Sequence, residues 1–421
     1  MRISTLQAFN NGVAGLQRNY ANATRTQEQI STGNRILTPA DDPVASVRLL
    51  QLDQQQNVLS QYNANLTAAK NSLTQEEVTL NSVNTVLQRV RELAVQAGNG
   101  GLSAEDRKSI AAELREREDE LLSLMNTRNA RGEYLFSGFQ GKTQPFVRAA
   151  DGSYSYQGDE GQRKLQIASS LNIPISDSGK SIFENVINAG RYVSALDTTA
   201  QPGSTLSVSA PLVQDEVAVS GNPPFPAAGV GVHFTSDTEY VVYDLASPPD
   251  FANPPIDPNL VLASGAVDKE SKTTEKLAFR GVVIQFDGIP VGSETVEIQL
   301  DPSAQKQGLL GTVSSLRMAL ESPSGNAQVR DAVAVALTNL DHGMVSVDAA
   351  RGNIGARLNV IETTQTDNED VALVNKAVQA ELRELDYAEA LSRLSFQTIL
   401  LEAAQQSYVK ISGLNLFNAM R

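Results

Sequence analysis

A ladder of leucines recurs every seven residues in the first quarter of the chain. Its members are Leu52, Leu59, Leu66, Leu73, Leu80 and Leu87. A strict spacing of seven keeps one apolar seam on one side of a helix wound at about 3.5 residues per turn, as in a coiled coil. Three residues further along each repeat, Gln55 and Glu76 are expected to leave wet notches. A lone helix cannot bury this seam, so the ladder requires partner helices.

Proline divides the 421 residues into two arms and a middle. Pro39 and Pro43 are followed by no proline until Pro145, and none follows Pro323. Because proline costs about 3 kcal/mol inside a helix, the arms are the natural places for long helices. The predicted fold class is α+β. Long N- and C-terminal helices pair as an antiparallel coiled-coil bundle, with a central, mainly antiparallel β domain.

The N-terminal arm is expected to hold three helices. A second heptad seam ends near Ile30, ahead of Ser31–Asn34. Asp42 is the expected N-cap of the ladder helix and Pro43 its first residue, with the helix reaching about Val95. After the glycines at 98–101, Ser103 and Asp106 predict a weak capping box for a helix ending near Arg128. The turn between the last two helices makes them antiparallel neighbours.

The middle of the chain has the period of β-strands. Asp151-Gly152 is a hairpin signal between two short apolar runs at 146–147 and 154–156. Apolar residues then alternate within 165–175, 206–208, 230–234, 282–286 and 296–300. Such runs, separated by proline and glycine, predict an antiparallel domain. The proline-rich stretch 247–258 is expected to be an irregular loop.

The helical period returns after Pro302 and continues toward the C-terminus. Between Thr363 and Asp370 the apolar seam turns polar, which indicates an interruption or a wet segment. The expected division is an N-terminal assembly helix and joint at 1–42, the two halves of a bundle at 43–144 and 304–384, a variable β-rich outer domain at 145–303, and a C-terminal assembly helix at 385–421.

The seams fall into two groups by their expected partners. Those joined by nearby turns are predicted to pack within the chain, and this bundle core comprises Leu52, Leu59, Leu66, Leu73, Leu80, Leu87, Ile110, Leu114, Leu121, Leu124, Leu337, Leu340, Val347, Ile354, Leu358 and Ile361. The outermost seams lack a nearby third element. They form the expected assembly interface with other copies, comprising Leu6, Phe9, Val13, Leu16, Tyr20, Ile30, Leu391, Leu394, Ile399, Leu414, Leu416 and Phe417. The expected joint comprises Gly33, Pro39, Asp41, Asp42 and Pro43.

Residue patterns for catalysis or cofactor binding are weak. His233 and His342 are the only histidines and match no zinc pattern, and there is no cysteine. Asp41 and Asp42 are better explained as a turn and a cap than as an acid and base pair. A net charge of −14 argues against nucleic-acid binding, and no apolar stretch is long enough to span a membrane. We therefore expect no catalytic residues, metal or cofactor.

Short motifs at both ends resemble the bacterial flagellin family. They are Met1–Thr5, Ser31–Pro43, Gly132–Gly138, Gly352–Asn359 and Leu414–Phe417. More narrowly, Asp41-Asp42-Pro43 together with Tyr134–Gly138 resembles the branch of that family that joins the hook to the filament. The resemblance covers about the first 145 residues and the last 95.

This resemblance implies a non-enzymatic structural adaptor. Such proteins pair their terminal helices in the inner wall of a tube and carry a variable domain outward. The implied partners are other copies in a ring, a hook-side junction protein, flagellin, and an export chaperone before secretion. The implied location is the extracellular flagellum, reached by type III export, and no cleaved signal peptide is visible. The alternatives are flagellin itself, which usually lacks the proline after these acids, a cytosolic coiled-coil adaptor, or a glycan-binding surface protein.

Overall fold

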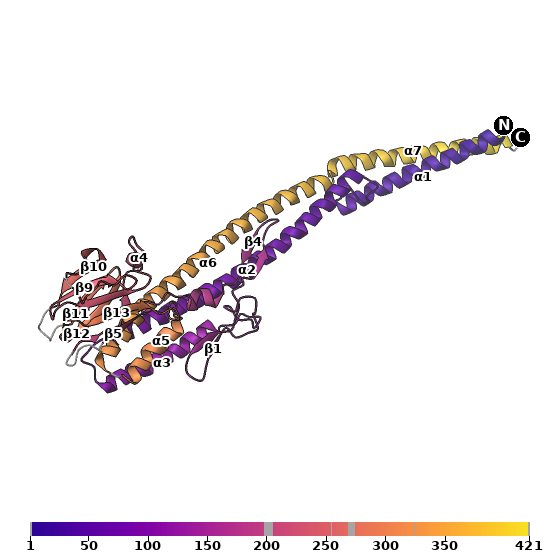
Figure 1. Ribbon diagram of the computed structural model, residues 1–421. Coiled ribbons are helices and arrows are strands. Elements are labelled where there is room, and N and C mark those ends of the chain that lie inside the picture. The colour runs from indigo at the N-terminus through magenta and orange to yellow at the C-terminus, as the bar shows by residue number, and fades with distance from the viewer. Residues whose placement is uncertain (1, 198–204, 254, 268–273, 324, 420–421) are drawn as a thin grey trace. The chain divides into compact units, whose positions relative to one another are not determined.

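The computed structural model describes residues 2–197, 205–253, 255–267, 274–323 and 325–419 (Figure 1). The side chains of residues 2–6, 8 and 411–419 lie outside the description. The helices are α1 (Arg2–Thr32), α2 (Pro43–Ala97), α3 (Ala104–Met125), α4 (Glu216–Val219), α5 (Leu309–Glu321), α6 (Asn326–Arg383) and α7 (Tyr387–Ala419), with short helical segments η1 (Lys180–Glu184) and η2 (Pro258–Leu260). The strands are β1 (Phe146–Arg148), β2 (Tyr154–Tyr156), β3 (Lys164–Gln166), β4 (Asn172–Pro174), β5 (Tyr192–Asp197), β6 (Ser207–Val208), β7 (Leu212–Val213), β8 (Val230–Phe234), β9 (Glu239–Asp244), β10 (Val261–Ala266), β11 (Glu275–Phe279), β12 (Val282–Asp287) and β13 (Thr295–Leu300).

The chain divides into two compact units. Unit 1 comprises Met1–Leu66, Ile167–Ser170 and Glu362–Arg421, and unit 2 comprises Thr67–Gln166 and Leu171–Ile361. Helices α2 and α6 each contribute residues to both units. The five-part division expected from the sequence has different boundaries and stays a prediction. None of the helices in the described residues is both long and apolar enough to cross a membrane.

In unit 1, α1 and α7 lie side by side with opposite chain directions, so that both chain ends lie together (Figure 1). The ring of Phe9 on α1 contacts the ring of Tyr408 on α7, with centroids 5.3 Å apart. Gly12 lies beside the Tyr408 ring, and a Cβ there would be in ordinary van der Waals contact with it at 3.4 Å. The predicted pairing of long terminal helices is confirmed.

In unit 2, α3 packs along α5, and α3 is joined to α2 by an ion pair between Arg89 and Glu113 at 2.8 Å. The capping box of Ser103 and Asp106 is confirmed. α3 ends at Met125, a few residues before the expected end. The ladder residues Leu73, Leu80 and Leu87 are fully buried in this unit.

A buried carboxylate ties the β1–β2 hairpin to these helices. Glu118 on α3 is fully buried and accepts hydrogen bonds from Arg317 on α5 at 2.7 Å, Arg148 on β1 at 2.9 Å and Tyr154 on β2 at 2.5 Å. Burial and the bond to Glu118 raise the pKa of Tyr154, which therefore stays protonated. Two guanidinium groups balance the buried charge, as a buried carboxylate requires. No sequence pattern had singled out Glu118.

The central part of unit 2 is an antiparallel β domain, as predicted. One sheet has the order β10-β9-β8-β13-β5, and β11, β12, β6 and β7 form another. Both sheets contribute to one core, in which Phe234 of β8 meets Phe286 of β12 edge to face at 5.5 Å. The predicted hairpin at Asp151-Gly152 is confirmed by the β1–β2 pairing. Residues 247–253 and 255–257 contain no strand, as expected.

Two expectations about polar positions need correction. Glu76 is 1% exposed, so it is a buried acid and not a wet notch. Helix α6 runs without interruption through Thr363–Asp370. Most side chains of 363–370 are exposed, so the alternative of a wet segment holds for them. Asn368 is buried, and its amide lies 3.4 Å from both Asn63 Oδ1 and the Ile167 carbonyl oxygen.

Shortening Leu80 to alanine tests the contribution of the ladder to stability. Because Leu80 is fully buried, Leu80→Ala should lower the free energy of unfolding by roughly 2 to 5 kcal/mol. Val78→Ala, at an exposed position of the same helix, should change it by less than about 0.5 kcal/mol. Urea denaturation of both variants measures the difference, and equal losses would contradict the assignment.

Candidate functional site

The joint between α1 and α2 is anchored to the connection between α6 and α7. Gly33 ends α1 with a positive φ of 69°, and a Cβ there would lie 2.9 Å from the Tyr387 hydroxyl oxygen. The Arg35 amide then donates to the Arg383 carbonyl at 2.8 Å, and the Leu385 amide donates to the Gly33 carbonyl at 3.0 Å. These bonds form a short antiparallel bridge between two segments that are far apart in the sequence.

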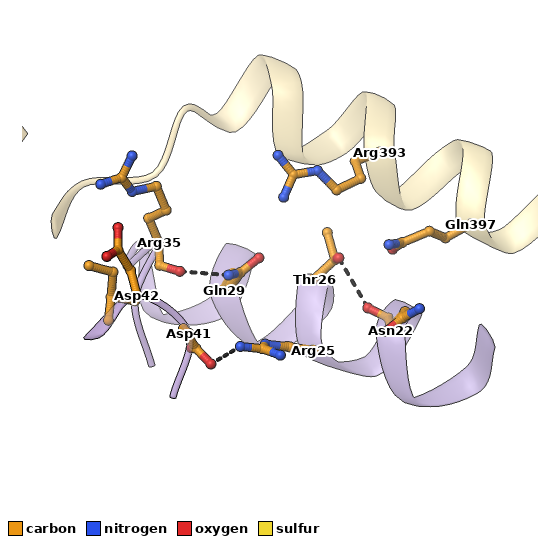
Figure 2. A pocket seen from close by; sticks show the side chains of 10 residues that line it. Asn22, Arg25, Thr26, Gln29, Arg35, Asp41, Asp42, Arg393 and Gln397 are labelled. Carbon is orange, nitrogen blue, oxygen red and sulfur yellow. Dashed lines mark hydrogen bonds and ion pairs between the residues drawn. The ribbon is translucent and has the colours of Figure 1, made fainter. Parts of the chain in front are cut away.

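Asp41 organises the rest of the joint. Its carboxylate is largely buried and accepts hydrogen bonds from the Leu37 amide at 2.9 Å and from the amide and hydroxyl of Thr38 at 3.1 and 2.8 Å. It also forms an ion pair with Arg25 of α1 (Figure 2). One side chain thus fixes the loop conformation and holds the loop against α1.

Asp42 begins the next helix. Its Oδ1 accepts a hydrogen bond from the Ala45 amide at 3.0 Å, which is the bond expected of an N-cap, and Pro43 is the first residue of α2. The interpretation of these two acids as a turn and a cap is confirmed by the hydrogen bonds. Pro39 lies exposed in the loop between them and Gly33.

Cavities lie on two sides of the joint. A polar cavity of about 360 Å³ lies between α1 and α7, where Thr26 and Gln29 face Arg393 and Gln397 (Figure 2). Gln29 donates from its amide to the Arg35 carbonyl at 2.6 Å. A second cavity, of about 530 Å³, is lined mainly by Ile36–Pro39, by Pro43–Leu50 and by Gln379 and Arg383.

Large apolar side chains of unit 1 remain exposed. On α7, Phe396 and Ile399 are 63% and 65% exposed, and on α1 Tyr20 is 64% exposed. Val44 and Val47 of α2 are also exposed, and Val47 lines the second cavity. These side chains are apolar surface of unit 1 that the chain itself leaves uncovered. Beside them, the joint is held by the hydrogen bonds of Gly33, Arg35 and Asp41.

The predicted assembly residues occupy different environments. Phe9, Tyr20, Leu391 and Ile399 are exposed, whereas Val13, Leu16, Ile30 and Leu394 are half-buried in the α1/α7 pair. The side chains of Leu6, Leu414, Leu416 and Phe417 lie outside the described residues. Phe396 and Val47 are also exposed, and neither is among the predicted assembly residues. The spacing of Val44, Val47 and Leu50, three residues apart, was a usable signal for a second apolar face on α2.

Most of the predicted bundle residues are buried. These are Leu59, Leu66, Leu73, Leu80, Leu87, Ile110, Leu114, Leu121, Leu340, Val347, Ile354 and Ile361. Leu52, Leu124, Leu337 and Leu358 are half-buried. Leu59 and Leu66 belong to unit 1 and the later ladder residues to unit 2, so that one ladder serves two separate cores. His233 lies in β8, 2.8 Å from the Thr295 hydroxyl, and His342 lies 3.0 Å from the Ile187 carbonyl.

Comparison with known proteins gives similarities to flagellar proteins. Residues 3–141 match the family described as bacterial flagellin N-terminal helical region. The chain is 36% identical over 186 residues to flagellar hook-associated protein 3 of Salmonella typhimurium, a match that covers 44% of this chain and 58% of the relative. It is 40% identical over 112 residues to the flagellar filament 41 kDa core protein of Borreliella burgdorferi, covering 27% and 32%.

A solved structure resembles a larger part of the chain. The crystal structure of flagellar hook-associated protein 3 from Legionella pneumophila superimposes with a TM-score of 0.63 and 26% identity, covering 79% of this chain and 98% of that one. The chain thus spans 58% of the length of its Salmonella relative and nearly all of the Legionella structure. The predicted resemblance to the flagellin family, and within it to hook-associated protein 3, is confirmed.

Replacing Asp41 tests its role in the joint. Asp41→Ala removes the acceptor of two backbone amides and the partner of Arg25. The free energy of opening the loop locally should fall by about 1 to 3 kcal/mol. Hydrogen exchange of the Leu37 and Thr38 amides should accelerate by at least tenfold. Asp370→Ala, at an exposed position of α6 in the same unit, is the control. Unchanged exchange in Asp41→Ala would show that the loop is held by other contacts.

Proposed function

We propose that this chain, which resembles hook-associated protein 3, is a structural adaptor of the bacterial flagellum. It forms a junction layer between a hook-side junction protein and the flagellin filament, and it is not an enzyme. The single observation that carries the proposal is the α1/α7 pair, which joins the chain ends and leaves large apolar side chains exposed. A surface of this kind needs a partner, and a layer of subunits supplies one.

The energetics of assembly follow from the exposed residues. Covering one side chain such as Phe396 or Ile399 contributes roughly 1.5 to 3 kcal/mol. Each subunit of a closed ring repeats the same contact, so a loss at one position recurs around the ring. The joint at Asp41 holds the end of α1, which supports a defined presentation of this surface.

The partners and location follow from the same proposal. The partners are other copies of the chain in a ring, the hook-side junction protein on one side and flagellin on the other. An export chaperone covers the apolar helices before secretion. The protein acts outside the cell, on the flagellum. These assignments rest on the resemblance to flagellar proteins and on the uncovered helices.

Flagellin itself is the second candidate. The identity to the Borreliella filament protein supports it, although that match covers 27% of the chain. The junction is favoured by the Legionella similarity, which extends over 79% of the chain. Immunogold labelling separates the two functions. Label confined to the hook-filament boundary supports the junction, whereas label along the filament identifies a flagellin.

A charged substitution on α7 tests the assembly surface. Because Phe396 and Ile399 are exposed, Phe396→Asp with Ile399→Asp should leave the isolated protein folded. Assembly should fail, because two charges would have to be buried. We expect hooks without filaments, flagellin in the medium and loss of swimming, as measured by electron microscopy and immunoblotting of the supernatant.

The control lies away from the proposed surface. Val217→Asp also places a charge at a highly exposed valine, but in the β domain of unit 2, and should permit normal filaments. Circular dichroism and secretion assays establish that both proteins fold and are exported. Full-length, firm filaments on cells that carry the α7 double variant would refute the assignment of this surface to the junction.

A further inference from the structure

Unit 2 contains an acid that the proposed assembly does not use. Glu76 stands in the leucine-ladder helix α2, and its side chain is 1% exposed. Its Oε1 atom has no hydrogen-bond partner among the described residues. The backbone amide of Asp177, in the segment after β4, donates to the same carboxyl group. A buried carboxyl group with so little compensation is costly when it carries a charge.

The neighbouring acid, Asp177, forms an ion pair with Arg357. Asp177 is 5% exposed and accepts two hydrogen bonds from Arg357 of α6, both at 2.9 Å, and one from the amide of Gln162 at 2.6 Å. The Asp177 carboxyl group is thus well supplied with donors, two of them from a guanidinium group. Arg357 belongs to the Gly352–Asn359 motif of the sequence, and its guanidinium binds the Asp177 carboxyl group.

Arg163, the other cation that acts on Glu76, also forms an ion pair with a different acid. Arg163 pairs with Glu133 at 2.5 Å. The groups that act on Glu76 are therefore Asp177 from the loop, Arg357 from α6 and Arg163 from the segment before β3. Among the described residues, Arg357 pairs with Asp177 and Arg163 pairs with Glu133, so that Glu76 has no ion-pair partner.

We propose that the Glu76 carboxyl group is a buried proton-binding site that holds the Asp177 segment against α2 and α6 while the proton is bound. With the proton present, the cluster contains one carboxylate and one guanidinium and is neutral. Loss of the proton leaves an extra buried negative charge beside Asp177. Repulsion between the two carboxylates then favours separation of residues 175–178 from α2.

The electrostatics support this direction. Burial and the Asp177 carboxylate raise the pKa of Glu76 well above its usual range, whereas the charge of Arg357, the hydrogen bond from the Asp177 backbone amide and the charge of Arg163 act in the opposite direction and only partly offset them. Because the folded-state pKa is higher than the unfolded one, the folded protein binds the extra proton. The associated stability is fully present below the unfolded pKa and is lost as the pH rises through the folded pKa.

Hydrogen bonds that do not involve Glu76 also hold the same segment. The Ile175 amide donates to the Arg163 carbonyl at 2.8 Å, and the Ser178 hydroxyl donates to the Asp159 carbonyl at 3.0 Å. The Ser72 hydroxyl on α2 donates to the Ile175 carbonyl at 3.0 Å. This bond does not titrate, so the segment remains attached on one side after the proton leaves. The expected consequence is local opening at residues 175–178 and not unfolding of unit 2.

The test compares the full-length protein with Glu76→Gln, which keeps the shape and removes the titration. Glu77→Gln, the next residue of α2, is the matched control. Between pH 5 and 9, the Tm of the original protein and of the control should fall relative to that of Glu76→Gln. At each pH, amide exchange at residues 175–178 should be faster in the original protein, by up to about tenfold per pH unit above the Glu76 pKa.

Titration of the Glu76 carboxyl group can also be measured directly in the original protein, where no substitution affects folding. Carbon-13 labelling of glutamate carboxyl groups, with Glu76 assigned by difference from Glu76→Gln, follows the proton in the original protein. The Glu76 signal should titrate at a higher pH than the exposed glutamates. Titration together with the exposed groups, or parallel Tm curves for Glu76→Gln and the original protein, would overturn the proposal.

Discussion

Burial of the heptad seam of α2 is the constraint on which the rest of the structure depends. In unit 2, Leu73, Leu80 and Leu87 are covered completely by the surrounding elements. In unit 1, the early ladder residue Leu52 is only half-buried, and the opposite face of the same helix exposes Val44 and Val47. The same helix therefore contributes to a core in each unit and also leaves apolar side chains exposed.

Polar groups fix the turns that this helical arrangement needs. Asp41 positions the joint by accepting hydrogen bonds from two backbone amides and by forming an ion pair with Arg25. Glu118 attaches the β1–β2 hairpin to α3 and α5 through Arg148 and Arg317. Such buried charges add little net stability when compared with apolar packing, but removal of one partner is expensive. Their effect is to favour one position of the joint and of the β1–β2 hairpin. Apolar contacts alone would define these positions less well.

The sequence predicted the periodic features well and the buried charges poorly. Heptad spacing located the long helices, and the alternation in 230–234 and 282–286 located two strands that share a core. Local capping rules were sufficient for Ser103 and Asp42 because the donor and acceptor lie within three residues. In each of these cases the decisive interaction is local or follows one helical or strand period.

Glu76, Glu118 and Asn368 depend on partners that are distant in the chain. Arg317 is 199 residues from Glu118, so no local pattern reveals their contact. A glutamate in a heptad seam is normally interpreted as solvated, and only the folded arrangement shows that Asp177 and α6 cover Glu76. Similarly, Asn368 remains helical and buried because it meets Asn63 and the Ile167 carbonyl. The contacts of such polar groups can be found only in the tertiary structure, whereas the apolar period of a helix or strand can be found in the sequence.

Hydroxyl-radical footprinting, read by mass spectrometry, tests most directly whether the exposed face of α1 and α7 is the assembly surface. Oxidation of Tyr20 and Phe396 is measured in the isolated protein and in purified hook-filament structures, with the exposed Phe139 of unit 2 as the reference. The account predicts strong oxidation of Tyr20 and Phe396 in the isolated protein and protection of both in the assembly, relative to Phe139. Equal oxidation of these two residues in both states would contradict it.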